Sequence, residues 1–522
     1  MASRITDMAT MVAQLQPPVK GLNYRTPAIK LDPQEALLLD NVLPQPQSGE
    51  LRSGYEDHVI NIPGSVNTLA PFVGNLFQDN RVFAFNDQGD VFDVTLSTDA
   101  PVAIEHTDQG DGNWDYTNSQ GVDQNYLILV SPAGGYWTYS TNGGLVQRDI
   151  TGDGAGKRFE AVFNWKDRVW LIEENSTKAY YLDIGAVQGP AHLFDFGPVM
   201  NQGGFLSYGQ NWTFNAGYDI DDYLVLVTTS GEVLVYKGVD PTQADSFLLQ
   251  GVWYVGRTPK GNKSFTTFGG EVFIMSALGV VPVSKLVNGG VANDYQVSSA
   301  QIQPELTKVF QLYKDNFGWE LETFYNRNFL MIKTPIKADG TYSYWIMNVQ
   351  TGAWGTISQM PMNCSSQVVD DIYFGTTDGR VCKAFTGNTD GQQIDGTPGR
   401  PIIGTYMGGF NDYSIPTNLK TWQLARPIFR STDKPAVAAS ILIQYESGLP
   451  TINGSETKNT SGGRFDISKW NECVWAGGAD TYSAWCGLQG LGYYGAYSIV
   501  FTGEAGTQYI SSNITLLQGG IM

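Results

Sequence analysis

Few side chains in this 522-residue chain have the types and spacing that catalysis or metal binding requires. The three histidines, His58, His106 and His192, lie far apart, outside any HExxH pattern or Cys/His cluster that would bind zinc. The segment TGDGAGKR (151–158) ends in Gly-Lys but lacks the first glycine and the final Ser/Thr of a phosphate-binding loop. No serine lies in a G-x-S-x-G pattern. The sequence therefore predicts no enzymatic activity, no cofactor and no metal site.

Two acidic turns have the composition of calcium sites, DQGDGNWD (108–115) and DITGDGAG (149–156). Neither fits the calcium loop of the EF-hand, which needs ligands at its first, third and fifth positions and a glutamate at its end. Asp and Gly are also the residues that hairpin turns prefer. We interpret both segments as structural turns.

The elements that would position such residues are β-hairpins. In NRVFAFNDQGDVFDVT (80–95), two runs of alternating apolar residues flank a polar turn that contains Gly89. This is the pattern of a hairpin with one buried face. The pattern occurs seven times, at 80–95, 125–140, 167–184, 222–238, 270–286, 327–349 and 371–385.

The spacing of the hairpins indicates the fold. Short aromatic runs precede them and supply further strands, and a unit of three or four strands that repeats at roughly 40–50 residues is typical of β-propeller blades. We therefore predict an all-β protein with a β-propeller of six or seven blades over residues 61–390. Unrelated hairpins in β-sandwiches are the alternative, which the regular order and spacing disfavour.

One helix is predicted inside the propeller, at 299–316. Ile302, Leu306 and Phe310 fall on one face of it. Such an insertion could cover the propeller, or it could contact a neighbouring subunit through these three residues. We carry them as candidate interface residues.

Residues 1–60 are predicted to form an N-terminal arm that packs with the C-terminal domain. An amphipathic helix is expected at 3–16, followed by a second helical turn that Asp32 caps and Pro33 begins. The segment 50–60 can then form a strand that closes the propeller ring.

A C-terminal β domain is predicted at 391–522. A turn-rich linker at 387–401 leads into it, and the long apolar strands beyond the linker resemble those of a β-sandwich. Within 418–434 only one acid, Asp433, accompanies four basic residues, in a chain of net charge −19. A solvated strand face would explain this pattern, and a docking face for an acidic partner is the alternative. The four candidate interface residues are Lys420, Arg426, Arg430 and Lys434.

Charge and apolar content restrict the classes of function. The chain has 32 Lys and Arg against 51 Asp and Glu, so it is not suited to wrapping DNA through counterion release. No apolar run approaches the 18 residues of a membrane span, and the N-terminus lacks the apolar region of a secretory signal. We expect no membrane insertion.

Both ends of the chain resemble one family. GLNYRTPAIKLDPQEALLLDNVLPQPQSGELRSGYEDHV (21–59) resembles the opening of tail nozzle (hub) proteins of short-tailed phages, a group that includes packaged-DNA stabilisation proteins. The shared features are the GLN-x-R-T start, the L-D-N segment and the E-L-R-x-G-Y strand before a β-propeller. LKTWQLARPIFRS (419–431) and the segment from WAGG to YSIVF (475–501) resemble the C-terminal β domain of that group.

The resemblance implies a structural virion protein. Six copies would form the tail nozzle ring below the portal and adaptor, as a channel for DNA retention and ejection and as a platform for other tail parts. The partners would be the adaptor (head-to-tail connector), tail fibre, spike or needle proteins, and genomic DNA that passes without specific binding. The protein would be located in the virion tail after assembly in the host cytoplasm. A glycan-binding propeller in host recognition is the alternative, and a polysaccharide-degrading enzyme is the third.

Charge predicts how such a channel would treat DNA. Six copies of net charge −19 would carry −114, and an acidic lumen would repel DNA over about 8–10 Å at physiological salt. DNA could then slide without the friction that basic contacts add, and its retention would need a plug or a narrow gate. We expect Lys420, Arg426 and Arg430 to lie away from the DNA path, toward the adaptor or a fibre.

Overall fold

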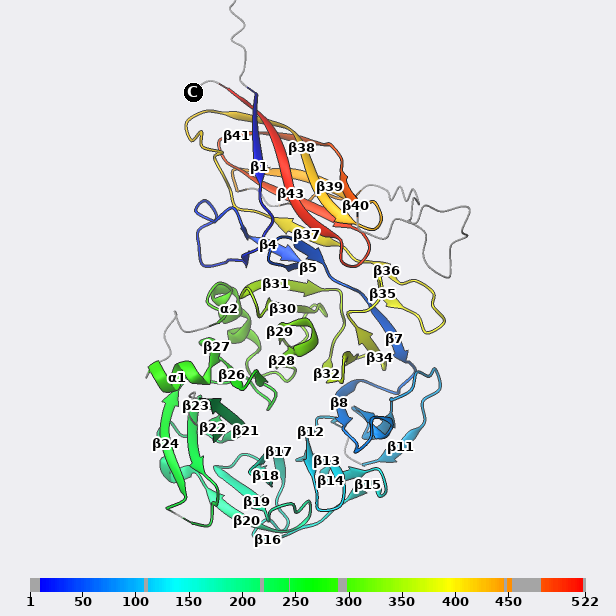
Figure 1. Cartoon of the computed structure of the whole chain (residues 1–522), viewed down its shortest axis with the longest axis vertical. Helices are drawn as coiled ribbons and strands as arrows, with labels where there is room; N and C mark the ends of the chain where they lie inside the picture. Colours follow the sequence, from blue (N-terminus) through cyan, green and yellow to red (C-terminus); the bar gives the residue numbers. More distant parts are fainter. Residues whose placement is uncertain are drawn as a thin grey trace, which may run out of the picture.

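The structure is a computed structural model of the full chain. It describes residues 10–107, 111–215, 220–243, 245–289, 298–445, 448–452 and 480–519. Small sheets form a ring, and a two-sheet unit beside the ring contains both ends of the described chain (Figure 1). The few described helices are short, namely α1 (Val283–Gly289), α2 (Gln303–Tyr313), η1 (Phe77–Asp79), η2 (Gly197–Val199) and η3 (Tyr325–Arg327). The predicted all-β class is confirmed.

Among the described residues, six sheets of the ring are separate from one another, and each is built on an antiparallel meander. The first two blades contain β8 (Val66–Phe72), β9 (Arg81–Asn86), β10 (Asp90–Asp93), β11 (Ala103–His106), β12 (Asp115–Gln120), β13 (Asn125–Ser131), β14 (Gly135–Ser140) and β15 (Gly144–Gln147). The next two contain β16 (Ile150–Gly152), β17 (Phe159–Trp165), β18 (Arg168–Glu173), β19 (Lys178–Leu182), β20 (Gly189–Asp195), β21 (Leu206–Asn215), β22 (Ile220–Thr228), β23 (Glu232–Gly238) and β24 (Phe247–Tyr254). The remaining two contain β25 (Phe265–Phe268), β26 (Glu271–Ser276), β27 (Gly279–Pro282), β32 (Cys364–Val368), β33 (Asp371–Gly375), β34 (Val381–Ala384), β7 (Tyr55–Val59), β35 (Thr389–Gln392) and β36 (Arg400–Pro401).

A seventh meander fills the place between β25 and β32 (Figure 1). It consists of β28 (Glu320–Phe324), β29 (Phe329–Lys333), β30 (Ser343–Asn348) and β31 (Ala353–Ser358). Unlike the other six, this meander belongs to a ten-stranded sheet that continues into the neighbouring unit. The propeller therefore has six blades with their own sheets and a seventh that shares its sheet.

The hairpin of the first blade shows why the repeated pattern makes blades. Asn86 Oδ1 accepts hydrogen bonds from the N–H groups of Gln88 and Asp90, and Gly89 has φ of 87°, which closes the turn between β9 and β10. β9 is buried on both faces after its first residue. One buried face was predicted, but neighbouring blades pack on both sides of a middle strand, so both faces are covered.

A strand from the N-terminal segment closes the ring. β7 pairs antiparallel with β34, with Glu56 opposite Lys383, so the last blade takes its fourth strand from the start of the chain. β35 pairs with β7 in turn, so the segment predicted as a turn-rich linker also belongs to this blade sheet.

The second unit is a β-sandwich. One of its sheets contains β40 (Asp480–Ser483), β41 (Cys486–Gly492), β38 (Lys420–Ser431), β43 (Gln508–Gln518), β1 (Thr10–Leu15), β6 (Gly49–Leu51) and β5 (Val42–Pro44). The other is the continuation of the ten-stranded sheet, with β2 (Gly21–Leu22), β3 (Glu35–Ala36), β4 (Leu38–Asp40), β37 (Gly404–Met407), β42 (Gly495–Thr502) and β39 (Ala436–Ile443). Trp422, Phe429, Tyr497, Phe501 and Ile514 belong to the core between the two sheets.

The two predicted N-terminal helices are wrong where the structure describes them. The described part of the first, Thr10–Leu15, is the strand β1, which pairs antiparallel with β43; residues 1–9 lie outside the described residues. At the second, Asp32 N–H donates to Glu35 Oε2 as in a helix start, but the chain then continues into β3 and β4. Pairing of β4 with β37 overrides the local helical signal, because it buries Leu39 completely.

Candidate functional site

A pocket of about 600 Å³ opens at the axis of the propeller. Many of the residues that line it share one position, at or within two residues of the start of the first strand of a blade. Because these first strands converge on the axis, their starts bring polar side chains from many blades together (Figure 1). Five such residues in the wall are Asp115, Glu160, Lys263, Glu320 and Asn363.

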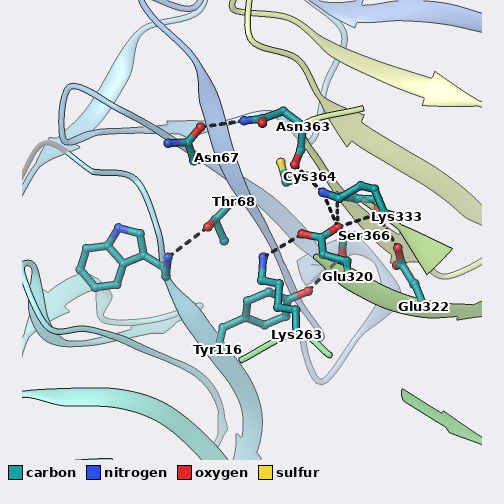
Figure 2. A network of polar contacts seen from close by, with 12 residues as sticks. Asn67, Thr68, Tyr116, Lys263, Glu320, Glu322, Lys333, Asn363, Cys364 and Ser366 are labelled. Atoms are coloured by element: carbon teal, nitrogen blue, oxygen red, sulfur yellow. Dashed lines mark hydrogen bonds and ion pairs between the residues drawn. The ribbon is translucent and has the colours of Figure 1, made fainter. Parts of the chain in front are cut away.

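Glu320 binds two lysines in this pocket (Figure 2). The antiparallel pairing of β28 with β29 places Glu320 opposite Lys333, and Lys333 Nζ lies 2.7 Å from Glu320 Oε2. Lys263 Nζ lies 3.4 Å from the other carboxylate oxygen. Burial acts to raise the pKa of Glu320, but the two lysines together bring this pKa below its ordinary value. The side chain of Lys333 is only 1% exposed, so this ion pair is part of the interior.

A second carboxylate, Glu322, holds a proton near neutral pH. Burial and the neighbouring charge of Glu320 raise the pKa of Glu322 to about 7. Ser365 Oγ lies 2.6 Å from Glu322 Oε2 and 3.0 Å from Glu320 Oε2. One hydroxyl has a single proton to donate, so a protonated Glu322 satisfies the arrangement by donating to Ser365 while Ser365 donates to Glu320.

Asp115 and Glu160 are two further carboxylates of the pocket. Burial raises the pKa of Asp115 to about 7, although its Oδ2 accepts a 2.8 Å hydrogen bond from the N–H of Val162. This bond joins β12 to β17 of the next blade. Burial also raises the pKa of Glu160.

Hydrogen bonds between side chains tie blades together around the axis (Figure 2). The hydroxyls of Tyr116 and Ser366 lie 3.2 Å apart and join the blade of β12 to that of β32. Asn363 Nδ2 donates to Asn67 Oδ1 at 2.7 Å, which joins the last blade to the first. The described residues contain no group of three or more His, Cys, Asp or Glu that could hold a metal ion. The arrangement thus balances buried charge and links blades.

The structure separates the four predicted basic residues. Lys420 is buried, and its Nζ donates to the carbonyls of Asn418 and Tyr493, so it does not belong to a docking face. Lys434 is exposed but follows the end of β38. Only Arg426 and Arg430 lie together, on the outer face of the sandwich.

The predicted contact residues of the inserted helix are also placed differently. The helix exists as α2, but Ile302, Leu306 and Phe310 are at most 4% exposed and belong to the core of the chain itself. Phe310 packs against Trp319, with ring centroids 5.8 Å apart. In this structure the three side chains are therefore unavailable to a neighbouring subunit.

The group of Glu320, Glu322, Lys263 and Lys333, called here the axial cluster, was not predicted. A signal for it exists in the sequence, because Glu320 and Glu322 alternate with apolar residues in WELETF and Lys333 ends the apolar run FLMIK. Charges inside strands that are otherwise apolar are expected only where they have partners.

Fold and site together define a β-propeller joined to a β-sandwich. No protein-family model matches the chain, and no curated protein matches it. Among solved structures, the extracellular domain described as that of the hybrid two-component system BT3049 from B. thetaiotaomicron is 12% identical, with a TM-score of 0.41 over 81% of this chain. The match spans 55% of that chain. BBS1N in complex with ARL6DN is 10% identical, with a TM-score of 0.37 over 64% of this chain and 98% of that one. None of the described helices is long and apolar enough to cross a membrane.

Proposed function

We propose that this chain is a structural subunit of a virion tail nozzle, located below the portal and adaptor. The observation that carries the proposal is the union of the two chain ends that resemble nozzle proteins. Segment 21–59 shares sheets with segment 419–431 and with the described part of segment 475–501, because β37 joins β4 to β42 and β43 joins β6 to β38. The resemblance at the two ends therefore concerns one folded unit, with the propeller inserted between them.

The architecture of the molecule suits a structural role in which the protein holds a fixed position in an assembly. The seventh blade and the sandwich share a ten-stranded sheet, so the two units are joined by strand pairing as well as by the covalent chain. Near this junction, Arg52 and Asp390 form a buried ion pair. A rigid two-part subunit can hold a fixed place in a ring, where its interfaces must recur identically.

The charge supports a channel that DNA passes without binding. The propeller region, 61–390, contains 19 basic and 35 acidic residues, a net charge of −16. Residues 391–522 contain 8 basic and 9 acidic residues, a net charge of −1. A lumen lined by the propeller would repel phosphate, whereas a lumen lined by Arg426 and Arg430 would bind it.

Removal of the protein from assembling particles tests this proposal. Particles made without it should fill with DNA and then lose it, and the purified chain should restore retention when added to them. Particles that retain DNA and eject it normally without this chain would contradict the proposal.

A glycan-binding propeller is the second candidate, and the axial pocket is the observation that favours it. Its wall combines carboxylates and amides with Phe317, a ring that is 53% exposed. Polar groups that converge beside an exposed ring can bind a sugar. Binding of the isolated monomer to a glycan array would favour this candidate over the nozzle.

A further inference from the structure

One face of the sandwich has the composition of a protein interface. It is the outward side of the sheet formed by β41, β38, β43 and β1, called here the Arg426 face. Strand alternation defines it, because Trp422, Ala425 and Phe429 of β38 belong to the core, whereas Leu424, Arg426 and Arg430 are exposed on the other side of the strand. The side chains that characterise the face are Val12, Leu424, Arg426, Arg430, Trp485 and Leu491.

Pairing across the strands gathers these residues. Leu424 and Val12 both lie opposite Thr515 of β43, one from each side. Thr421, on the same side of β38, lies opposite Leu491. Val12, Leu424 and Leu491 thus come from three strands that are far apart in sequence, and Trp485 directly precedes β41.

Apolar exposure on this face is high for a surface in water. Val12 is 67% exposed, Leu491 60%, Trp485 54% and Leu424 41%. The guanidinium of Arg426 lies over the ring of Trp485, 5.8 Å from the ring centroid. Trp and Arg surrounded by apolar residues are the side chains that contribute most to binding at protein interfaces.

Acids lie only at the edge of the Arg426 face among the described residues of its sheet: Glu50 of β6 lies opposite Gln508, which lies opposite Arg430, and Asp480 of β40 lies opposite Ser431. The strands β1, β38, β41 and β43 contain no Asp or Glu, in a chain that has 51 of them. The propeller has a net charge of −16. The two parts of one molecule are therefore electrostatically complementary. Arg426 and Arg430 lie on the outer surface of the sandwich, where Arg426 donates to the hydroxyl of Ser483.

We propose that the Arg426 face binds the acidic propeller of a second copy of this chain. Every copy of the chain carries both the Arg426 face and an acidic propeller, so the two surfaces are always present at equal concentration. A contact between the propeller of one copy and the sandwich of another pairs opposite charges. A two-fold contact of the face with itself would bring arginines together and is disfavoured. The contact joins two different surfaces, so it propagates from copy to copy and closes into a ring when the rotation allows.

This contact would supply the ring interface that the proposed function requires, but the inference does not depend on a virion. Sedimentation velocity of the purified full chain tests it, over a range of concentrations and at 50 and 500 mM salt. The wild-type chain should form species of defined mass above 57.2 kDa at low salt and dissociate at high salt. The double variant Arg426→Glu/Arg430→Glu should raise the dissociation constant at least about tenfold. Trp485→Ala should also raise it, without changing the salt dependence.

Lys434→Glu is the matched control, because Lys434 is an exposed base of the same unit outside the face. It should leave the dissociation constant unchanged, and circular dichroism should show that every variant is folded. A wild-type chain that stays monomeric up to about 100 μM, where a stable interface would already be occupied, would overturn the inference. Assembly of the double variant with the wild-type dissociation constant would overturn it equally. So would a double variant that assembles with itself normally but no longer binds an acidic tail protein such as the adaptor. Self-assembly in a protein that no virion contains would end the proposed function and leave this inference standing.

Discussion

Arg52 and Asp390 are 338 residues apart in the chain, yet Nη1 and Nη2 of Arg52 each donate to one carboxylate oxygen of Asp390 at 2.7 Å. Their side chains are 0% and 4% exposed. Arg52 Nε also donates to Asn41 Oδ1, and Nη2 donates to the carbonyl of Ser358 in the seventh blade. One guanidinium thus joins the N-terminal segment, the last two blades and the start of the sandwich.

Loss of one partner of this pair should destabilise the whole molecule. Asp390→Asn leaves the Arg52 charge buried without its counter-ion, which costs roughly 3–5 kcal/mol. The free energy of unfolding, measured by urea denaturation, should fall by that amount. Lys20→Met breaks the exposed pair of Lys20 with Asp32 and should change it little. Equal effects of the two variants would contradict a special role for the buried pair.

The axial pair of Lys333 and Glu320 should behave in the same way, with rescue by a second substitution. Lys333→Met leaves Glu320 with only the more distant Lys263 and should cost about 3–5 kcal/mol of unfolding free energy. The double variant Lys333→Met/Glu320→Gln removes both charges and should recover most of this loss. A double variant no more stable than Lys333→Met would mean that packing, and not charge, sets the cost.

Stability should decrease as pH rises toward neutrality. The pKa values of Glu322 and Asp115 are about 7 in the folded protein, against ordinary values of 4.5 and 3.8. Between these values the folded state keeps protons that the unfolded state has released, so the slope of unfolding free energy against pH is negative. The stabilisation that these two protonated carboxyl groups contribute to the unfolding free energy is full below about pH 4, and it is lost as pH rises through about 7.

Glu322→Gln should flatten this dependence between pH 5 and 8, as measured by urea unfolding at each pH. The other groups around Glu322 are Glu320, Lys333, Lys263 and Ser365. Glu320 has a lowered pKa, so its contribution is present above its ordinary pKa and is lost only as pH falls below that range. It is therefore constant over the interval measured. A slope that Glu322→Gln leaves unchanged would refute the assignment.

The inserted helix α2 should act as part of the core. Leu306→Ala creates a cavity in the core cluster that also contains Phe310 and Trp319 and should cost about 2–5 kcal/mol of unfolding free energy. Leu312 of the same helix is 74% exposed, and Leu312→Ala should stay within about 0.5 kcal/mol of the wild type. If Leu306→Ala changes assembly but leaves stability unaffected, the helix is a subunit contact, which is one of the two alternatives that the sequence leaves open.

The propeller was predictable because the strands of each blade are close together in the sequence. A hairpin such as β9 and β10 needs only its own alternation and its own turn at Gly89, and the repeat spacing then gives the ring. The N-terminal arm was not predictable in this way. β1 forms its strand against Leu516 and its neighbours in β43, some 500 residues later, and no local signal reports a partner at that distance.

The candidate site residues also differ in whether a local sequence signal can predict their positions. Strand alternation would have separated buried Lys420 from exposed Arg426 and Arg430, but only once the bulge between Trp422 and Leu424 is known, since it shifts the register. The axial cluster depends on which blade starts converge, and this is a property of the closed ring. Glu320 and Lys263 therefore become neighbours only in three dimensions.

The central claim is that this chain builds a ring in a virion tail. Native mass measurement of purified tail complexes, with quantitation of each protein, tests it most directly. Six copies of this 57.2 kDa chain per tail are predicted, in one ring next to the adaptor. A tail that contains a single copy, or none, would contradict the account.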